Sequence, residues 1–236
     1  MNIIDIQNLT KVYNTNGVPV QALNGIDLSA EQGEFSAIAG PSGSGKTTLL
    51  NIIGGLDQPT HGSVRVVDTE LGGLSARDLS DMRLQKIGFI FQAYNLIPVL
   101  TAVENVEYIL LLQGAGKEER RSRAEEMLRE VGLGRELNRR PAELSGGQQQ
   151  RIAVARAIVS EPDLVLADEP TANLDQKTGA SLLDLMRELN HEKQITFIFS
   201  THDPMVMERA DRLIHLTDGK ISADEHKGDR PGSPGQ

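Results

Sequence analysis

The length of 236 residues exceeds the roughly 100–200 of a usual single domain, so the chain should form one large core or a core with an inserted subdomain. Its 24 basic and 33 acidic residues, a net charge of −9, argue against binding along a phosphate backbone, and we expect no nucleic-acid partner. The absence of cysteine excludes a disulfide framework and a thiolate metal site, and it is compatible with a reducing cytoplasm.

The first part of the chain alternates short β-like runs with turn residues. NIIDIQ, VQALNGIDLSA and GEFSAIAG, which includes a turn at Gly33, predict a small antiparallel sheet that leads into a core strand. The start of the chain lacks the basic residues and apolar stretch of a secretory signal. After Gly40 we expect a helix in KTTLLNIIGG, a strand near GSVRVV and a further strand in KIGFIF.

The middle of the chain is helical in pattern. Thr101 and Glu104 have the spacing of a capping box, and EERRSRAEEMLREV predicts a second helix, its alternating charges forming a solvated face. The apolar runs here are far shorter than the ~20 residues of a membrane helix. If the protein acts at a membrane, we therefore expect it to lie on the membrane surface and not to span it. We expect a helical subdomain inserted at about residues 95–158.

The remaining residues return to alternating strands and helices. DLVLAD and ITFIFS are near-continuous apolar strands, typical of a parallel sheet covered on both faces. A helix over about 177–189 lies between them, and a short helix after Pro204 and a hairpin that turns at Asp218 and Gly219 follow. We expect one domain over residues 1–222 and a disordered tail over 223–236.

A glycine-rich segment follows the first core strand. Gly40, Gly45, Lys46 and Thr47 have the spacing of a P-loop between a strand and a helix. Its backbone N–H groups would bind phosphate, Lys46 would reach the β- and γ-phosphates, and the Thr47 hydroxyl would ligate Mg²⁺. The fold expected is α/β: a P-loop NTPase core with a mostly parallel sheet, an N-terminal antiparallel β subdomain and an inserted α-helical subdomain. The residues expected to bind the nucleotide here are Gly40, Ser42, Gly43, Ser44, Gly45, Lys46, Thr47 and Thr48.

Two acids end the apolar strand in DLVLADEP. Ligands bind at the carboxyl ends of strands in open α/β sheets, so Asp168 is expected to hold Mg²⁺ and Glu169 to polarise the attacking water. This pair favours hydrolysis over transfer of phosphate to another substrate. The alternative is a simple acidic turn after a core strand.

A second glycine-rich helix start occurs in LSGGQQQR. Ser145, Gly146 and Gly147 precede the helical QQQRIAVARAIV, which predicts another anion site. We expect it to lie away from the chain's own P-loop and to bind the γ-phosphate on a second copy, in a head-to-tail dimer with two ATP molecules between the chains. The alternative, a serine N-cap without a ligand, leaves the two glycines unexplained.

These motifs together resemble the ATP-binding cassette (ABC) ATPases. LSGGQ, the P-loop, the Asp-Glu strand end, the glutamine of GFIFQ and the histidine of FSTHD carry the resemblance, which extends to about residue 222. It implies that Gln148 also belongs to the second anion site, that Gln92 senses Mg²⁺ and water, and that His202 contacts the γ-phosphate. It also implies that the run 172–175 touches the partner's site and that Tyr13 stacks on adenine, although Tyr13 could simply cover the small sheet.

The runs GGLDQPT, FQAYNLIPVLTAVENV and ADEPTANLD are most similar to the bacterial lipoprotein-release and macrolide-export type. That resemblance implies a membrane permease with a large extracytoplasmic domain as partner, and a peripheral position on the cytoplasmic side of the inner membrane. Ala172 stands where many of that type have glycine, and VRVVDTELGG lacks their usual glycine turn. The apolar run 96–100 is a candidate docking groove for the permease, with core packing of the insert as the alternative.

Other kinds of cassette ATPase are possible. Soluble members of DNA repair or translation are disfavoured by length and charge, since no sustained heptads separate Lys46 from Asp168. A division-type cassette that activates an extracytoplasmic hydrolase through its permease stays open, because its ATPase would have the same motifs. The substrate and the direction of transport are not specified by these residues.

Overall fold

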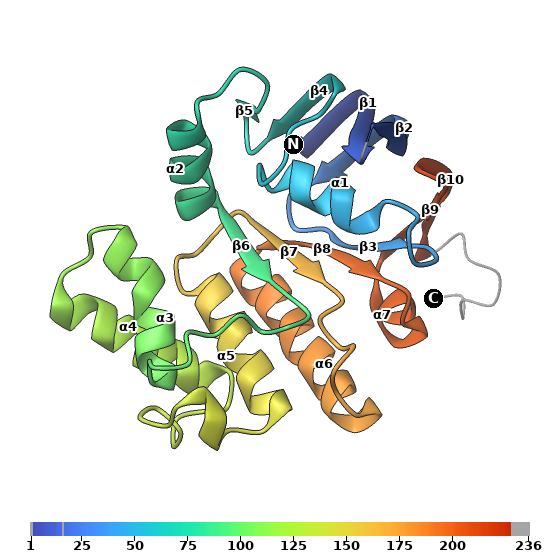
Figure 1. Ribbon diagram of the computed structural model, residues 1–236. Coiled ribbons are helices and arrows are strands. Elements are labelled where there is room, and N and C mark those ends of the chain that lie inside the picture. The colour runs from blue at the N-terminus through green and yellow to red at the C-terminus, as the bar shows by residue number, and fades with distance from the viewer. Residues whose placement is uncertain (1, 16, 228–236) are drawn as a thin grey trace.

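The computed structural model describes residues 2–15 and 17–227. Its central feature is a six-stranded sheet in the order β10-β9-β3-β8-β7-β6, in which every neighbouring pair is parallel except β9 and β10 (Figure 1). The strands are β3 (Phe35–Ala39), β6 (Ile87–Ile90), β7 (Leu164–Asp168), β8 (Thr196–Thr201), β9 (Arg212–Thr217) and β10 (Lys220–His226). All residues of β3 and β8 are buried, as expected for parallel strands with both faces covered.

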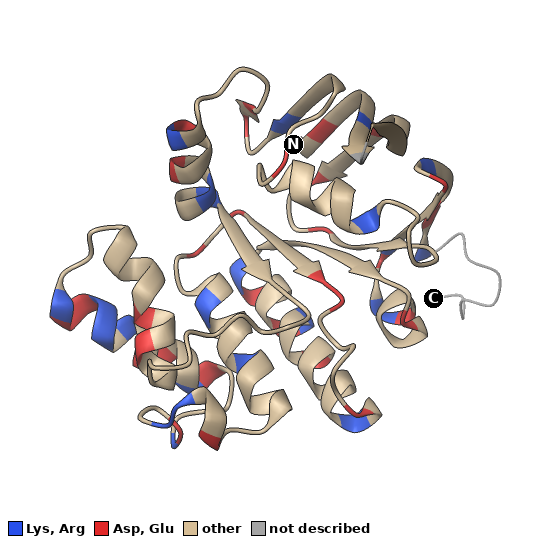
Figure 2. Cartoon of the chain, in the orientation of Figure 1, with Lys and Arg blue, Asp and Glu red and all other residues tan. Residues whose placement is uncertain are grey.

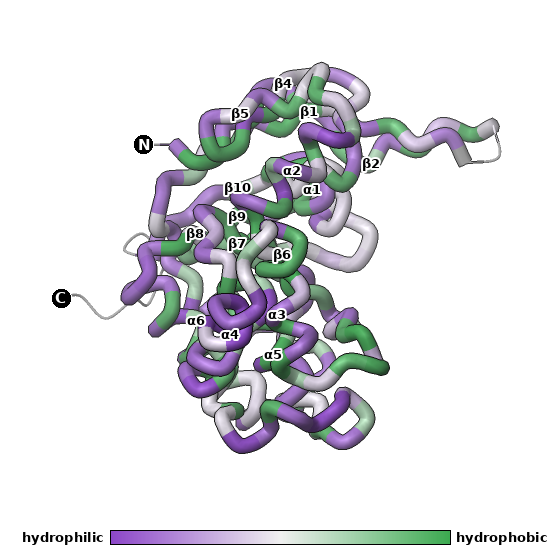
Figure 3. Tube along the Cα trace, turned by 90° about the vertical axis from the view of Figure 1, so that its left-hand side faces the viewer, coloured by the Kyte–Doolittle hydropathy of each residue, from purple (hydrophilic) through white to green (hydrophobic). Residues whose placement is uncertain are grey.

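A smaller antiparallel sheet covers one face of the central sheet. Its order is β2-β1-β4-β5, made by β1 (Asn2–Thr15), β2 (Val18–Glu31), β4 (His61–Val66) and β5 (Thr69–Glu70). Helix α1 (Lys46–Ile53) packs between the two sheets in one apolar cluster that includes Ile4, Ile52 and Ile198. The far ends of β1 and β2 project from the body of the molecule (Figure 3). The antiparallel β subdomain expected from the sequence is confirmed.

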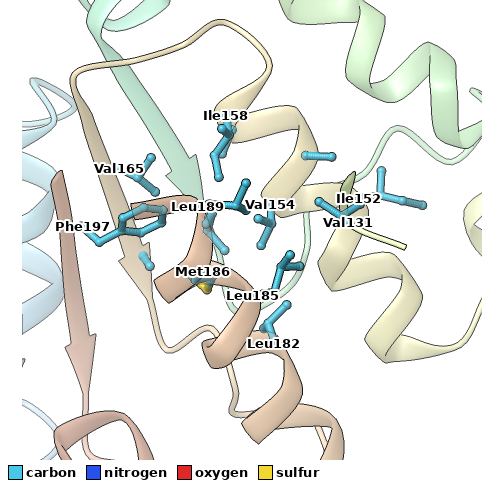
Figure 4. Close-up of a cluster of buried hydrophobic side chains, with 14 of the residues drawn as sticks. Val131, Ile152, Val154, Ile158, Val165, Leu182, Leu185, Met186, Leu189 and Phe197 are labelled. Carbon is cyan, nitrogen blue, oxygen red and sulfur yellow. The ribbon is translucent and has the colours of Figure 1, made fainter. Parts of the chain in front are cut away.

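Helices cover the opposite face of the central sheet. They are α3 (Ala102–Leu112), α4 (Lys117–Glu130), the short η1 (Pro141–Glu143), α5 (Gly146–Ile158), α6 (Gln176–Lys193) and α7 (Pro204–Arg209). Val154 and Ile158 of α5 meet Met186 of α6 and Val165 and Phe197 of the sheet in one buried cluster (Figure 4). The inserted helices therefore share their core with the sheet and do not have one of their own.

The charged helix of the insert forms as predicted. Thr101 and Glu104 make the expected capping box at the start of α3. Along α4, Arg121 and Arg129 both pair with Glu125, and acidic and basic residues alternate on this helix (Figure 2). Among the described residues, none of the helices combines the length and the apolar character that a membrane span requires.

Helix α2 (Ala76–Lys86) was not predicted from the sequence. The Ser75 side chain caps it by accepting a hydrogen bond from Asp78 N, but only Leu79 and Met82 are buried along its length. So little apolar periodicity is hard to distinguish from a polar loop.

The expected start of the disordered tail at residue 223 is wrong. Strand β10 continues to His226 because it pairs with β9 and because its side chains alternate between exposed and half-buried. Arg212 donates to both oxygens of Asp224 at 2.8 and 2.6 Å and also pairs with Glu34 at 3.3 Å, which ties β10 to the core. The part of the prediction that concerns residues 228–236 lies outside the described residues.

Candidate nucleotide-binding and hydrolysis site

The loop between β3 and α1 requires glycine for steric reasons. A Cβ at Gly40 would lie 2.1 Å from Leu216 O, and one at Gly45 would lie 2.6 Å from Ala22 O. Gly43 and Gly45 have φ angles of +81° and +105°, which side chains disfavour. The Ser44 hydroxyl is buried and has no hydrogen-bond partner among the described residues. A tight glycine-rich turn at a helix start, together with the Ser44 hydroxyl as an unused donor, fits a bound phosphate group.

Lys46 is buried beneath this loop and is directed into it. Its Nζ donates to Gly40 O at 2.8 Å and to Pro41 O at 3.0 Å. An ammonium group has three N–H donors, so one is left for another acceptor. The loop thus holds a positive charge at the place where phosphate would lie.

Thr47 and Asp168 come together from two elements. Thr47 Oγ1, in the first turn of α1, lies 3.2 and 3.3 Å from the two carboxylate oxygens of Asp168 at the end of β7. Ser200 Oγ donates to Asp168 Oδ1 at 2.7 Å and orients the carboxylate. Hydroxyl and carboxylate oxygens are the ligands Mg²⁺ prefers, and one or two carboxylates with substrate phosphates suffice for it, so this donor set fits that ion.

Glu169 is held in a strained conformation beside His202. Its φ of +46° lies in the left-handed region, and its N–H donates to Ser200 O at 2.9 Å. His202 Nδ1 and Glu169 Oε1 are 2.7 Å apart, and Thr201 Oγ1 donates weakly to the other oxygen at 3.4 Å. Strain at a non-glycine residue is typical of functional positions. The direct contact between these two predicted catalytic residues had no signal in the sequence.

Most of the P-loop residues predicted to bind the nucleotide line a cleft of about 430 Å³ together with Gln92, Asp168, Glu169 and His202. Its walls come from the P-loop, the carboxyl ends of β7 and β8, and the second strand of the chain. The lining residues are Val20, Gln21, Ala22, Ser42, Gly43, Gly45, Lys46, Thr47, Thr48, Gln92, Asp168, Glu169 and His202. The contribution of residues 20–22 was missed, because nothing in a β-like run shows which distant loop it will face.

Tyr13 is not among the residues that line this cleft. Its hydroxyl donates to Asp57 Oδ2 at 2.6 Å, and Lys11 Nζ lies 4.7 Å from the ring centroid. Partial burial and the bond to Asp57 raise the pKa of the Tyr13 hydroxyl. The ring is 36% exposed, so the stacking on adenine stays a prediction.

The second glycine-rich helix start lies outside the cleft of the same chain. The side chain of Ser145 accepts from Gln148 N, and the Gln148 side chain accepts from Ser145 N, which completes a capping box. A Cβ at Gly146 would lie 2.8 Å from Tyr94 Oη, and one at Gly147 would lie 2.4 Å from Thr178 Cγ2. Close packing is therefore a reason for both glycines that the sequence argument lacked, and glycine by itself does not demonstrate an anion site here.

Gln92 links the cleft to the helical insert. It lines the cleft, and its backbone oxygen accepts from Asn173 Nδ2 at 2.8 Å. Tyr94 and Asn95, which follow, have φ angles of +59° and +50°. The guanidinium of Arg156 on α5 donates to both of their carbonyl oxygens, and burial lowers the pKa of Arg156. The turn after Gln92 is thus fixed by two other segments.

A parallel sheet with a phosphate loop after β3, an acidic pair at the end of β7 and a histidine after β8 defines a P-loop nucleoside triphosphatase. The ABC transporter family model matches residues 23–172, and the chain belongs to this family. It is therefore an ATP-binding subunit that hydrolyses ATP, as the sequence predicted.

Known relatives agree with the predicted subtype. The chain is 46% identical to the lipoprotein-releasing system ATP-binding protein LolD of Anaeromyxobacter dehalogenans, over 94% of this chain and 93% of that protein. It is 45% identical to the macrolide export ATP-binding/permease protein MacB of Mannheimia succiniciproducens, over 96% of this chain but 35% of that longer protein. The resemblance to lipoprotein-release and macrolide-export cassettes is confirmed.

Solved structures share the fold. The dimeric cassette MJ0796 bound to ADP and Pi is 44% identical, with a TM-score of 0.88 over 94% of this chain and 98% of that chain. MJ0796 belongs to Methanocaldococcus jannaschii.

Proposed function

We propose that this ABC ATPase works as a head-to-tail dimer that closes around two MgATP and drives a membrane permease from the cytoplasmic side of the inner membrane. The observation that carries the proposal is the separation within one chain of two glycine-rich helix starts. The P-loop lies in the cleft with Asp168, Glu169 and His202, whereas Ser145, Gly146, Gly147 and Gln148 are not among the residues that line it. Each cleft would be completed by the other copy.

The ATP phosphates would lie against the backbone N–H groups of residues 40–48, where Lys46 supplies positive charge. Thr47, Asp168 and Gln92 would hold Mg²⁺, which when bound neutralises the negative charge that develops on the phosphates. All three line the cleft, and Thr47 and Asp168 are in contact.

Glu169 would orient the water that attacks the γ-phosphate. Its carboxylate is a hydrogen-bond acceptor at the carboxyl end of β7, held by its contact with His202 at 2.7 Å. His202 is largely exposed and lines the cleft, so its other ring nitrogen would be available to a phosphate oxygen. Lys46 and Gln92 are the other two residues that we expect to take part in hydrolysis.

The dimer is supported by the similar cassette MJ0796, whose two structures are described as dimeric. In this chain Ser145 at the start of α5 is exposed and Gly146, Gly147 and Gln148 are partly exposed, so a second copy could reach this helix start. A phosphate on a second copy would accept hydrogen bonds from the backbone of this helix start.

A second, apolar groove of about 390 Å³ suits a permease segment. It is lined by Leu56, Phe89, Ile97 and Ile109 among others, together with the two cations Arg83 and Arg156 and no carboxylate. Of the predicted docking run 96–100, Ile97 lines the groove and Val99 is 71% exposed, whereas Leu96 packs against the core. An amphipathic helix would fit this groove. The similar protein MacB is a macrolide export ATP-binding/permease protein, which joins the two parts in one chain and supports this partnership.

The test is the mass in solution of the Glu169→Gln variant with and without ATP, measured by light scattering. The amide keeps the shape of the side chain but lacks the carboxylate, so hydrolysis should fall by about 10²-fold or more and the ATP-bound dimer should accumulate. Glu126→Gln on the exposed face of α4 is the matched control and should hydrolyse at the normal rate.

Adding Ser145→Arg to the Glu169→Gln chain should abolish the dimer while each monomer still binds ATP. A dimer of normal stability in that double variant would refute the role in the second site. A Glu169→Gln chain that hydrolyses ATP rapidly would refute the role of the carboxylate.

A further inference from the structure

A fully buried glutamine connects the second glycine-rich helix start to the loop that carries Glu169. Gln150 lies near the start of α5, is 0% exposed, and donates from Nε2 to the carbonyl oxygen of Pro170 at 2.8 Å. Because a carbonyl oxygen can only accept, the amide nitrogen must face Pro170. One hydrogen bond therefore joins two motifs that are distant in the sequence.

The other end of this amide has no partner. Gln150 Oε1 is buried and accepts no hydrogen bond among the described residues. A buried unsatisfied oxygen lowers stability, and an apolar side chain of the same length would avoid that cost. Packing alone therefore does not account for a glutamine at this position, and the bond to Pro170 O is what distinguishes it from methionine.

The carbonyl that Gln150 holds is next to the strained residue. Glu169 has a φ of +46° and donates its N–H to Ser200 O on β8. Pro170 follows directly with a φ restricted by its ring, so a displacement of the Pro170 ring is passed to Glu169 through the peptide bond that joins them. Thr171 Oγ1 donates to Asp203 Oδ2 at 2.7 Å and fixes the far side. The backbone of Glu169 thus lies between an anchor on β8 and an anchor on α5.

The backbone at the start of α5 packs closely against two neighbouring side chains. The distances that a Cβ would have at Gly146 and Gly147, 2.8 Å to Tyr94 Oη and 2.4 Å to Thr178 Cγ2, show backbone in direct contact with its neighbours. Close-packed interiors are hardly compressible, so they pass on displacements rather than absorb them. A movement of the helix start would reach Gln150, and through it Pro170.

We infer that Gln150 is a positioning residue that couples the two ATP sites of the dimer. When the start of α5 closes on the nucleotide of the partner, Gln150 shifts the Pro170 carbonyl and thereby sets the position of Glu169 in the chain's own cleft. ATP bound at one site then controls hydrolysis at the other. This inference rests on the proposed function, because it requires two sites that are each built from two copies.

Hydrolysis by Gln150→Met and Gln150→Glu tests the coupling. Methionine keeps the length without a donor, and the glutamate carboxylate cannot donate to a carbonyl. Both variants should bind ATP as monomers like the wild type, lose about tenfold or more in kcat, and show a Hill coefficient for ATP that falls from about 2 towards about 1.

Gln149→Met and Gln149→Glu are the matched controls. Gln149 is the neighbour of Gln150 on the same helix, and its Nε2 donates to Leu144 O at 3.1 Å, within the loop that precedes that helix. Both control variants should keep the kcat and the Hill coefficient of the wild type.

A double-mutant cycle distinguishes coupling from damaged packing. Ser145→Ala should lower kcat in the wild-type chain and have little further effect in the Gln150→Met chain, because the relay is already broken. Effects on kcat that multiply would overturn the inference, and so would Gln150 variants with normal kcat and Hill coefficient. Loss of both monomer ATP binding and the folded state in the two Gln150 variants would also overturn it, since Gln150 would then serve the fold.

A different result would contradict the proposed function itself. A Glu169→Gln chain that stays monomeric with ATP would contradict the dimer and the coupling together, before any Gln150 variant is made. An ATP-dependent dimer whose cooperativity is unchanged by Gln150→Met would leave the proposed function intact and remove the coupling alone.

Discussion

At the scale of single residues, the groups that we propose to act on phosphate are held by one another as well as by the backbone. Asp168 receives hydrogen bonds from Thr47 and Ser200, and Glu169 contacts His202. Each carboxylate therefore has a defined orientation before any nucleotide binds. Such preorganisation is what makes fixed charges effective in a site, because little has to rearrange during the reaction.

Lys46→Ala should weaken ATP binding about 10- to 100-fold, because it removes a charge-assisted hydrogen bond to phosphate. It also leaves the carbonyl oxygens of Gly40 and Pro41 without their donor. Titration with a fluorescent ATP analogue measures the change. Lys220→Ala on the exposed edge strand β10 is the control and should bind normally, whereas unchanged affinity of Lys46→Ala would count against the assignment of the P-loop.

At the scale of helices and strands, the start of α5 shows how one residue type can serve two requirements. The glycines at 146 and 147 permit close approach of an anion, but they are also needed for contact with Tyr94 and Thr178. The two reasons can be separated because the packing conflict at Gly147 involves a single methyl group.

Gly147→Ala should lower the free energy of unfolding by about 1–3 kcal/mol, because its Cβ would lie 2.4 Å from Thr178 Cγ2. Adding Thr178→Ser removes that methyl group and keeps the hydroxyl that donates to Asp175, so stability should return. Urea unfolding measures both. If ATPase activity stays low in the stable double variant, the glycine is needed for the nucleotide; full activity would mean that packing was its only role.

Strand β10 depends on the pairing of Arg212 with Asp224. The hydrogen bond from Arg212 lowers the pKa of Asp224 below its ordinary value. A carboxyl with a lowered pKa in the folded state stabilises the protein above its unfolded pKa of about 4, and the contribution is lost as the pH falls through the folded value. Asp224→Asn should therefore lower Tm at neutral pH, and the difference from wild type should shrink between about pH 5 and pH 3.

Thermal unfolding followed by circular dichroism across this pH range checks the prediction for Asp224. Asp218→Asn, in the turn that joins β9 to β10, is the control and should leave Tm nearly unchanged. A difference between Asp224→Asn and wild type that is the same at pH 7 and pH 3 would show that the carboxylate charge is not involved.

At the scale of the whole molecule, the two surfaces proposed for partners lie on different parts of the fold. The nucleotide cleft is formed by β2, the P-loop and the ends of β7 and β8. The apolar groove is formed by α2, β6, α3 and α5. Gln92 and the turn after it lie between these two surfaces, and Asn173 and Arg156 hold this segment on both sides. The segment after Gln92 therefore contacts both the surface proposed for docking and the cleft proposed for hydrolysis.

Leu56→Glu should release the chain from its permease and leave ATP-dependent dimerisation intact. The side chain lines the groove and is 48% exposed, so a carboxylate would be tolerated by the fold but not by an apolar partner surface. The measurement is the fraction of the chain that sediments with the membranes of its own cells. Leu112→Glu, 53% exposed and not among the groove residues, is the control. Equal sedimentation of Leu56→Glu and wild type would argue against the groove.

Most of the fold was predictable from local patterns, and the failures have a physical cause. The strands of the central sheet are near-continuous apolar runs, and the caps at Thr101 and Ser145 follow from short-range spacing. Helix α2 and the end of β10 carry little apolar periodicity, because only Leu79 and Met82 of α2 are buried and β10 lies at the sheet edge. Their stability comes from neighbours that a local window does not contain.

The sequence by itself determined the family, the ATPase chemistry and the residues expected at the site, because a P-loop, an acidic strand end and LSGGQ are short motifs whose chemistry depends on adjacent residues. Only the tertiary structure decided which of those residues meet. It joined Glu169 to His202, brought residues 20–22 to the cleft, placed Tyr13 against Asp57, and connected Gln150 to Pro170. These contacts depend on how the two sheets and the helices pack, and packing is a property of the whole chain rather than of any motif.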